Sequence, residues 1–136
     1  PRGVSGPADL LVRYRRPTPR LSEGRALGPV VRAMMDVSDG LLLDASRMAA
    51  ASGLALAIDL AAVPLSPAYR AWGGDPLAAA TAGDDYELLF ALPDGVRPPV
   101  AATRIGAFVA GAGLNLHQGG APVPLPERLG YLHART

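Results

Sequence analysis

The chain has 136 residues, of which 49% are hydrophobic and 18% charged, a composition that excludes a wholly disordered or tail-like protein. It contains no cysteine, which excludes disulfides, thiolate metal sites and cysteine nucleophiles and is typical of a reducing compartment. The net charge of +1 is unevenly spread, because residues 33–94 carry nine acids against two arginines while both flanking regions are basic. This acidic middle favours a bound cation over nucleic acid.

All 13 basic residues are arginine, so Schiff-base chemistry and a P-loop lysine are excluded. No apolar run is long enough to cross a bilayer. We therefore expect a cytoplasmic protein that binds neither membrane nor nucleic acid. The 16 glycines and 14 prolines predict short elements joined by many turns.

The first thirty residues predict little regular structure. Residues 7–14 favour a short helix, and the prolines at 17 and 19 then force an extended, arginine-rich linker. A weak helix is expected from Ser22 toward Arg32, followed by a buried strand over residues 30–37. We assign residues 1–29 to an N-terminal helix and linker and residues 30–136 to one domain.

The strongest predicted helix covers residues 40–52, because Leu41, Ala45, Met48 and Ser52 share one helical face and Gly53 provides a stop. Strands are then expected over residues 54–60, 86–92, 104–110 and 114–118, with short helices over 66–72 and from Asp75 to about Gly83. In the strand over 86–92, Tyr86, Leu88, Phe90 and Leu92 alternate onto one face. The pattern predicts an α/β (α+β) layered domain with helices packed on a mixed sheet.

The first candidate site is the run from Asp36 to Gly40, where the strand over 30–37 ends and the strongest helix begins. Asp36, Ser38 and Asp39 offer three oxygen acceptors, and Mg²⁺ commonly joins one or two carboxylates to substrate phosphates. A helix N-terminus also attracts phosphate. The run therefore suits a magnesium–phosphate site, although Ser38 or Asp39 could instead cap the helix and leave Asp36 as a solvated acid.

The second candidate site is the acidic turn Gly83-Asp84-Asp85-Tyr86-Glu87, which leads into a strand. Its adjacent carboxylates can ligate a metal or accept hydrogen bonds from a polar ring, or they can simply form an Asp-rich turn. His117 and His133 are isolated, which favours structural or solvated roles over metal binding. The arginines at 13, 15 and 16 lack the aromatic neighbours of a nucleic-acid motif and favour a solvated linker.

Both candidate sites match motifs of one enzyme family. Residues 36–44 contain the pattern DxSDGLxxD, and residues 82–90 read AGDDYELLF, close to GGEDYELLF. Together with Arg-Pro-x-Pro-Arg at 16–20 and Gly130-Tyr131 near the end, they resemble the thiamine-monophosphate kinase family over nearly the whole chain. Relatives in the aminoimidazole ribonucleotide synthetase superfamily tend to carry Gly-rich or Thr-containing variants at residues 38–41.

This resemblance implies the fold of the C-terminal domain of aminoimidazole ribonucleotide synthetase. It also implies ATP-dependent, Mg²⁺-dependent phosphorylation of thiamine phosphate to thiamine diphosphate, with no side-chain nucleophile. By the same resemblance, Asp36 and Asp39 ligate Mg²⁺ and Ser38 contacts ATP. Asp84 takes the place of a substrate-binding Glu, and Tyr131 folds back against the thiamine.

The chain departs from the family pattern in two respects. Ala82 and Asp84 stand where the family usually has Gly and Glu. The family's N-terminal domain, which supplies further metal-binding aspartates, much of the ATP site and the dimer contact, has no counterpart here. We therefore expect the C-terminal part of an enzyme that is homodimeric when intact, able to fold alone but a poor kinase.

Two other functions are compatible with the same motifs. The chain could be the C-terminal half of another ATP-using synthetase of this superfamily. It could also be a non-catalytic domain that binds a nucleotide or a protein partner and keeps the motifs as relics.

Overall fold

The computed structural model describes residues 11–12 and 15–132. The helix predicted over residues 7–14 falls largely outside them, as does His133. The described helices are α2 (Leu21–Leu27), α3 (Leu41–Ser52), η1 (Leu60–Ala62, a 3₁₀ turn), α4 (Pro67–Ala71) and α5 (Pro76–Thr81). The strands are β1 (Ala33–Val37), β2 (Ala55–Asp59), β3 (Glu87–Ala91), β4 (Gly106–Val109), β5 (Gly113–Gln118) and β6 (Ala121–Val123). No helix in this part of the chain is long and apolar enough to cross a membrane.

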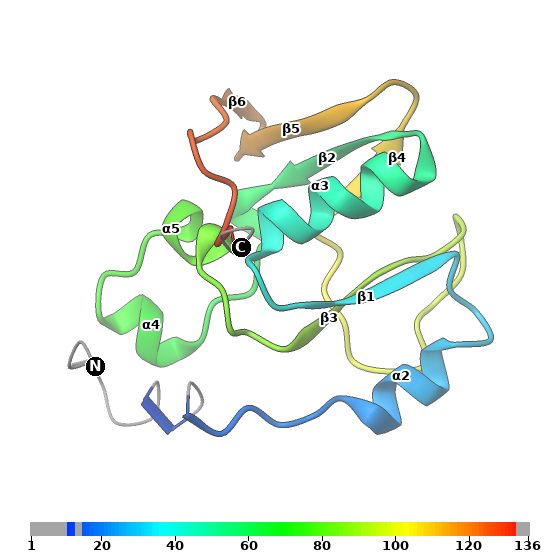
Figure 1. Ribbon diagram of the computed structural model, residues 1–136, viewed down its shortest axis with the longest axis horizontal. Helices are drawn as coiled ribbons and strands as arrows, with labels where there is room; N and C mark the ends of the chain where they lie inside the picture. Colours follow the sequence, from blue (N-terminus) through cyan, green and yellow to red (C-terminus); the bar gives the residue numbers. More distant parts are fainter. Residues whose placement is uncertain (1–10, 13–14, 133–136) are drawn as a thin grey trace.

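The strands form two sheets, with α3 running between them (Figure 1). The larger sheet has the order β4-β2-β5-β6, in which β2 and β5 are parallel and the other pairs antiparallel. The smaller one is the antiparallel pair β1-β3. The predicted α/β layering on a mixed sheet is thus confirmed, but β1 and β3 stand apart from the main sheet.

Helix α3 supplies the centre of the core. It ends at Gly53, whose left-handed φ of 64° lets its N–H bond back to the carbonyls of Ala49 and Ala50. The buried core joins α3 to β2, β5, η1 and α5 through Leu42, Ala45, Ala49, Leu56, Ile58, Leu60, Val63, Ala80, Leu114 and Leu116. The helix predicted over residues 40–52 is confirmed, although Ser52 lies outside its buried face.

Three strand predictions need correction. The strand after α2 begins only at Ala33, and it is not buried throughout, because Asp36 is exposed and Met34 is 37% exposed. Strand β3 begins at Glu87, since Tyr86 has a left-handed φ of 52° that breaks the alternation. Leu89, not the predicted face containing Leu88 and Phe90, packs against the core.

Strand β6 was not predicted, because it is very short and contains Pro122, which only an edge strand tolerates.

A buried carboxylate holds the turn between β1 and α3. Asp44, in the first turn of α3, is 0% exposed. Its Oδ2 accepts hydrogen bonds from the backbone N–H groups of Ser38 (2.9 Å) and Asp39 (3.0 Å). Its Oδ1 accepts a hydrogen bond from Nη1 of Arg47 at 2.8 Å. Both carboxylate oxygens are therefore paired, as burial of a charge requires.

The C-terminal segment returns to the same turn. The Tyr131 N–H donates to the Asp39 carbonyl at 2.7 Å. Gly130 lies so close to this carbonyl and to the Leu43 side chain that a Cβ atom would clash with both. Leu129, just before it, packs against the core. The tail is thus docked on the β1–α3 turn.

Replacing Asp44 with Ala should destabilise the chain by about 1–3 kcal/mol, because two backbone N–H groups lose their acceptor, whereas the half-exposed Arg47 can turn to water. Urea unfolding would measure this change in the free energy of unfolding. Asp94→Ala is the matched control: this exposed acid lies in a surface turn, and we expect a change within about 0.5 kcal/mol. Equal effects of the two substitutions would contradict a structural role for Asp44.

Replacing Gly130 with Ala should release the tail, because the added methyl group meets backbone that cannot yield. We expect faster chymotryptic cleavage beside Tyr131, with a melting temperature close to that of the unsubstituted chain. Gly28→Ala is the control, because a Cβ there would meet only ordinary contacts, the nearest at 3.6 Å. Unchanged cleavage of the Gly130→Ala variant would show that the tail does not depend on this close approach.

Candidate functional site

The first candidate site lies at the turn from β1 to α3, as predicted. Asp36 is exposed near the end of β1, and Ser38 and Asp39 are half-buried in the turn. The alternative in which Ser38 or Asp39 caps α3 is wrong, because the N-cap position is Gly40, with φ of 118°, and no side chain caps the helix. Asp44 instead accepts the N–H groups of Ser38 and Asp39, which precede the helix. The side chains of Asp36 and Ser38 are therefore not used to start α3.

Arg47 already provides a cation at this turn. Its Nη1 atom lies 2.6 Å from Oδ2 of Asp39 and 2.8 Å from Oδ1 of Asp44. The hydrogen bond to Asp39, reinforced by the one to Asp44, raises the pKa of Arg47 above its usual value. Arg47 therefore supplies part of the positive charge that the clustered acids of this turn were expected to need. The sequence pattern did not single out this arginine.

The second candidate site packs directly against the first. The Asp84 N–H donates to the Ser38 carbonyl, and the Tyr86 N–H donates to the Val37 carbonyl, each at 2.8 Å. Gly83 makes room for this approach, since a Cβ atom there would lie 2.8 Å from the Ser38 oxygen. The acidic turn therefore runs alongside the β1–α3 turn.

The backbone of the acidic turn is strained. Asp84 and Tyr86 have φ angles of 68° and 52°, in the left-handed region that non-glycine residues seldom occupy. The Tyr86 hydroxyl donates to Oδ1 of Asp84 at 3.3 Å. Such strain is retained where surrounding contacts fix a geometry, and it is common at binding sites.

The carboxylates beyond Asp84 have different environments. Desolvation, with the negative charges of Glu87 and Asp84, raises the pKa of Asp85 to about 6. The residue as a whole is exposed, so water screens part of this effect. Glu87 forms a two-pronged pair with Arg20, whose Nε and Nη2 lie 2.9 and 2.7 Å from the two carboxylate oxygens. This pair ties the end of the linker to the start of β3.

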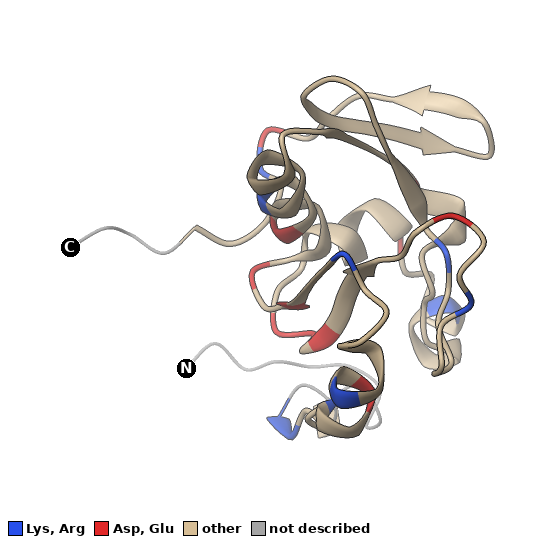
Figure 2. Cartoon of the chain, turned by 90° about the vertical axis from the view of Figure 1, so that its right-hand side faces the viewer, with Lys and Arg blue, Asp and Glu red and all other residues tan. Residues whose placement is uncertain are grey.

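The five predicted site residues therefore lie on three chain segments that meet. Asp36, Ser38 and Asp39 belong to the β1–α3 turn, Asp84 is bonded through its backbone to Ser38, and Tyr131 is bonded through its backbone to Asp39. Acidic segments gather between α3 and α2 (Figure 2). Tyr131 is 63% exposed, and its backbone N–H is bonded to the Asp39 carbonyl.

The oxygen donors at the β1–α3 turn suit Mg²⁺ in kind but do not complete a site. Within the described residues no group of three or more His, Cys, Asp or Glu side chains lies close enough to hold a metal ion. Mg²⁺ often uses one or two carboxylates and takes its other ligands from water and phosphate. The carboxylates of Asp36 and Asp39 are of the kind that Mg²⁺ uses in this way.

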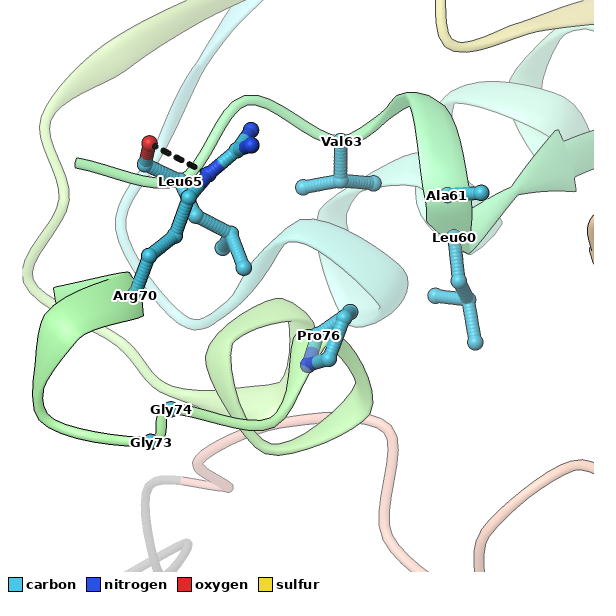
Figure 3. A pocket seen from close by; sticks show the side chains of 8 residues that line it. All are labelled: Leu60, Ala61, Val63, Leu65, Arg70, Gly73, Gly74 and Pro76. Atoms are coloured by element: carbon cyan, nitrogen blue, oxygen red, sulfur yellow. Dashed lines mark hydrogen bonds between the residues drawn. The ribbon is translucent and has the colours of Figure 1, made fainter. Parts of the chain in front are cut away.

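A hollow lies elsewhere, between η1, α4 and α5 (Figure 3). It has a volume of about 400 Å³ and is lined by Leu60, Ala61, Val63, Leu65, Arg70, Gly73, Gly74 and Pro76. Arg70 Nε donates to the Leu65 carbonyl at 3.2 Å. None of the predicted site residues lines this hollow.

Comparisons with known proteins agree with the motif reading. Residues 8–116 match the family model described as AIR synthase related protein, C-terminal domain. The chain is 37% identical to the thiamine-monophosphate kinase of Caulobacter vibrioides, with 91% of this chain and 40% of that protein covered. It is 36% identical to the Salmonella typhimurium enzyme, with coverages of 93% and 43%. The chain thus spans about two fifths of the length of these curated relatives.

Solved structures give the same relationship. The crystal structure of thiamine-monophosphate kinase from Stenotrophomonas maltophilia K279a aligns with a TM-score of 0.74 and 35% identity, covering 85% of this chain and 40% of that chain. AaThiL complexed with AMPPCP and TMP aligns with a TM-score of 0.74 and 32% identity, covering 91% and 41%. The fold, the motifs and the family model agree, and the chain belongs to the family of AIR synthase related proteins, as a C-terminal domain.

Proposed function

We propose that this chain is the C-terminal part of an ATP-dependent kinase that converts thiamine phosphate to thiamine diphosphate. The observation that carries this proposal is the meeting of three motif-bearing segments through the backbone bonds of Asp84 to Ser38 and of Tyr131 to Asp39. The similarity to thiamine-monophosphate kinases, and to a structure holding an ATP analogue and TMP, supports it.

In this proposal the β1–α3 turn serves the phosphates. Asp36 and Asp39 hold Mg²⁺, and Ser38 contacts ATP. The bound Mg²⁺ neutralises charge on the transferring phosphoryl group. Because the β1–α3 turn is fixed by Asp44, these donors are held in place before a ligand arrives.

The acidic turn and the tail serve the other substrate. Thiamine carries a cationic thiazolium ring and an aminopyrimidine ring, so a carboxylate and an aromatic ring are suitable partners. Asp84 provides the carboxylate, and the exposed ring of Tyr131 provides an aromatic face. Asp85 adds a second carboxylate beside Asp84, which favours a cationic ligand over a neutral one.

This chemistry needs positioning more than a reactive side chain. Phosphoryl transfer is accelerated chiefly by orientation and by neutralisation of charge, so the lack of cysteine and lysine is no obstacle. The remaining ligands would come from an N-terminal domain of the intact enzyme, which we propose to be homodimeric and cytoplasmic. The chain alone should therefore turn over thiamine phosphate poorly.

A chimeric enzyme tests the function. In it, this chain replaces the matching part of the Caulobacter vibrioides thiamine-monophosphate kinase. We expect Mg²⁺-dependent phosphorylation of thiamine phosphate by ATP. Asp36→Asn in the chimera should lower turnover by roughly a hundredfold or more, because an amide oxygen replaces a charged metal ligand, while the melting temperature stays nearly constant.

Asp94→Asn in the same chimera is the control, and it should leave turnover unchanged. A chimera that folds, dimerises and binds ATP but does not phosphorylate thiamine phosphate would contradict the proposed substrate. A large loss of stability in the Asp36→Asn variant with an unchanged Mg²⁺ dependence would make Asp36 a structural residue.

A further inference from the structure

Arg47 joins two acids of different character through a single nitrogen atom. Its Nη1 lies 2.6 Å from Oδ2 of Asp39 and 2.8 Å from Oδ1 of Asp44. Asp39 belongs to the β1–α3 turn, and Asp44 is its buried anchor. The position of this guanidinium therefore affects both the fold of the turn and the charge available on it.

The two contacts differ in how readily they can open. The Asp44 side chain is 1% exposed and also holds two backbone N–H groups, so it cannot move without disturbing the turn. The Asp39 side chain is 13% exposed, and that of Arg47 is 46% exposed. Rotation of the guanidinium toward water would break its bond to Oδ2 of Asp39, while Asp44 keeps its bonds to the N–H groups of Ser38 and Asp39.

We propose that Arg47 competes with a divalent cation for the Asp39 carboxylate and so lowers the affinity of the β1–α3 turn for that cation. The inference rests on the proposed role of Asp36 and Asp39 as Mg²⁺ ligands. A metal ion bound to the Asp39 carboxylate would lie close to the guanidinium of Arg47, and the two positive charges would repel each other. Arg47 is thus a positioning residue that sets how strongly the turn binds metal when no phosphate is present.

The competition predicts a gain of metal affinity when the charge of Arg47 is removed. We would measure Mn²⁺ binding to this chain by electron paramagnetic resonance, because Mn²⁺ takes the same oxygen ligands as Mg²⁺. Arg47→Gln removes the charge but keeps a hydrogen-bond donor for Asp44. It should bind Mn²⁺ roughly three- to tenfold more tightly, which is the change in affinity expected when one nearby, partly screened positive charge is removed. Arg47→Lys keeps the charge and should bind within about twofold of the unsubstituted chain.

Two further variants separate the possible outcomes. Arg97→Gln removes an exposed arginine in a loop and should leave Mn²⁺ affinity unchanged. Asp36→Asn should weaken Mn²⁺ binding in the Arg47→Gln background as well as alone. If Arg47→Gln does not fold, Arg47→His at pH 8, where the imidazole is neutral, provides the same comparison.

Tighter binding by the Arg47→Gln variant, reversed in Arg47→Lys, supports the competition. Equal or weaker binding by Arg47→Gln, with Asp36→Asn still weakening it, overturns the competition and leaves the proposed metal site standing. If Mn²⁺ binds neither the unsubstituted chain nor Arg47→Gln, or if Asp36→Asn changes nothing, the turn by itself does not hold the cation and the inference fails, whereas the proposed function is tested separately by the chimera.

Discussion

The buried carboxylate of Asp44 is the interaction on which the rest of the candidate site depends. By accepting the N–H groups of Ser38 and Asp39, it fixes the turn between β1 and α3. No side chain of this turn caps the helix. The carbonyls of the same two residues accept the N–H groups of Asp84 and Tyr131. One buried carboxylate thus fixes the β1–α3 turn, and the carbonyls of this turn bind two segments that are distant in sequence, at Asp84 and Tyr131.

The charge balance follows from this arrangement. Acids concentrated at one place are costly to hold together, and the structure offsets them with arginines. Arg47 pairs with Asp39 and Asp44, and Arg20, the last residue of the Arg-Pro-x-Pro-Arg run, pairs with Glu87. Among the acids of the acidic turn, Asp84 and Asp85 make no ion pair that the structure shows. The unmatched negative charge therefore lies where the proposed function places a cationic ring.

Local sequence patterns predicted the elements and the motif positions, because capping residues, helical spacing and strand alternation act over a few residues. They placed α3 and its stop at Gly53 correctly. They missed the long-range features. The left-handed Tyr86, the separate β1-β3 pair and the pairing of β6 arise from contacts between segments far apart in sequence. Asp44 is part of the motif, four residues after Gly40, but the motif alone did not predict that its side chain is buried.

The most direct test of the central role of Asp44 is amide hydrogen exchange, measured by NMR on the unsubstituted chain and on Asp44→Ala, which removes the acceptor of both N–H groups. We expect the amides of Ser38, Asp39, Asp84 and Tyr131 to be protected in the chain and to lose protection together in the variant, while Leu56 and Leu116 in the main sheet keep theirs. Unchanged protection of Asp84 and Tyr131 in the variant would show that the three segments meet independently of Asp44 and would contradict the account.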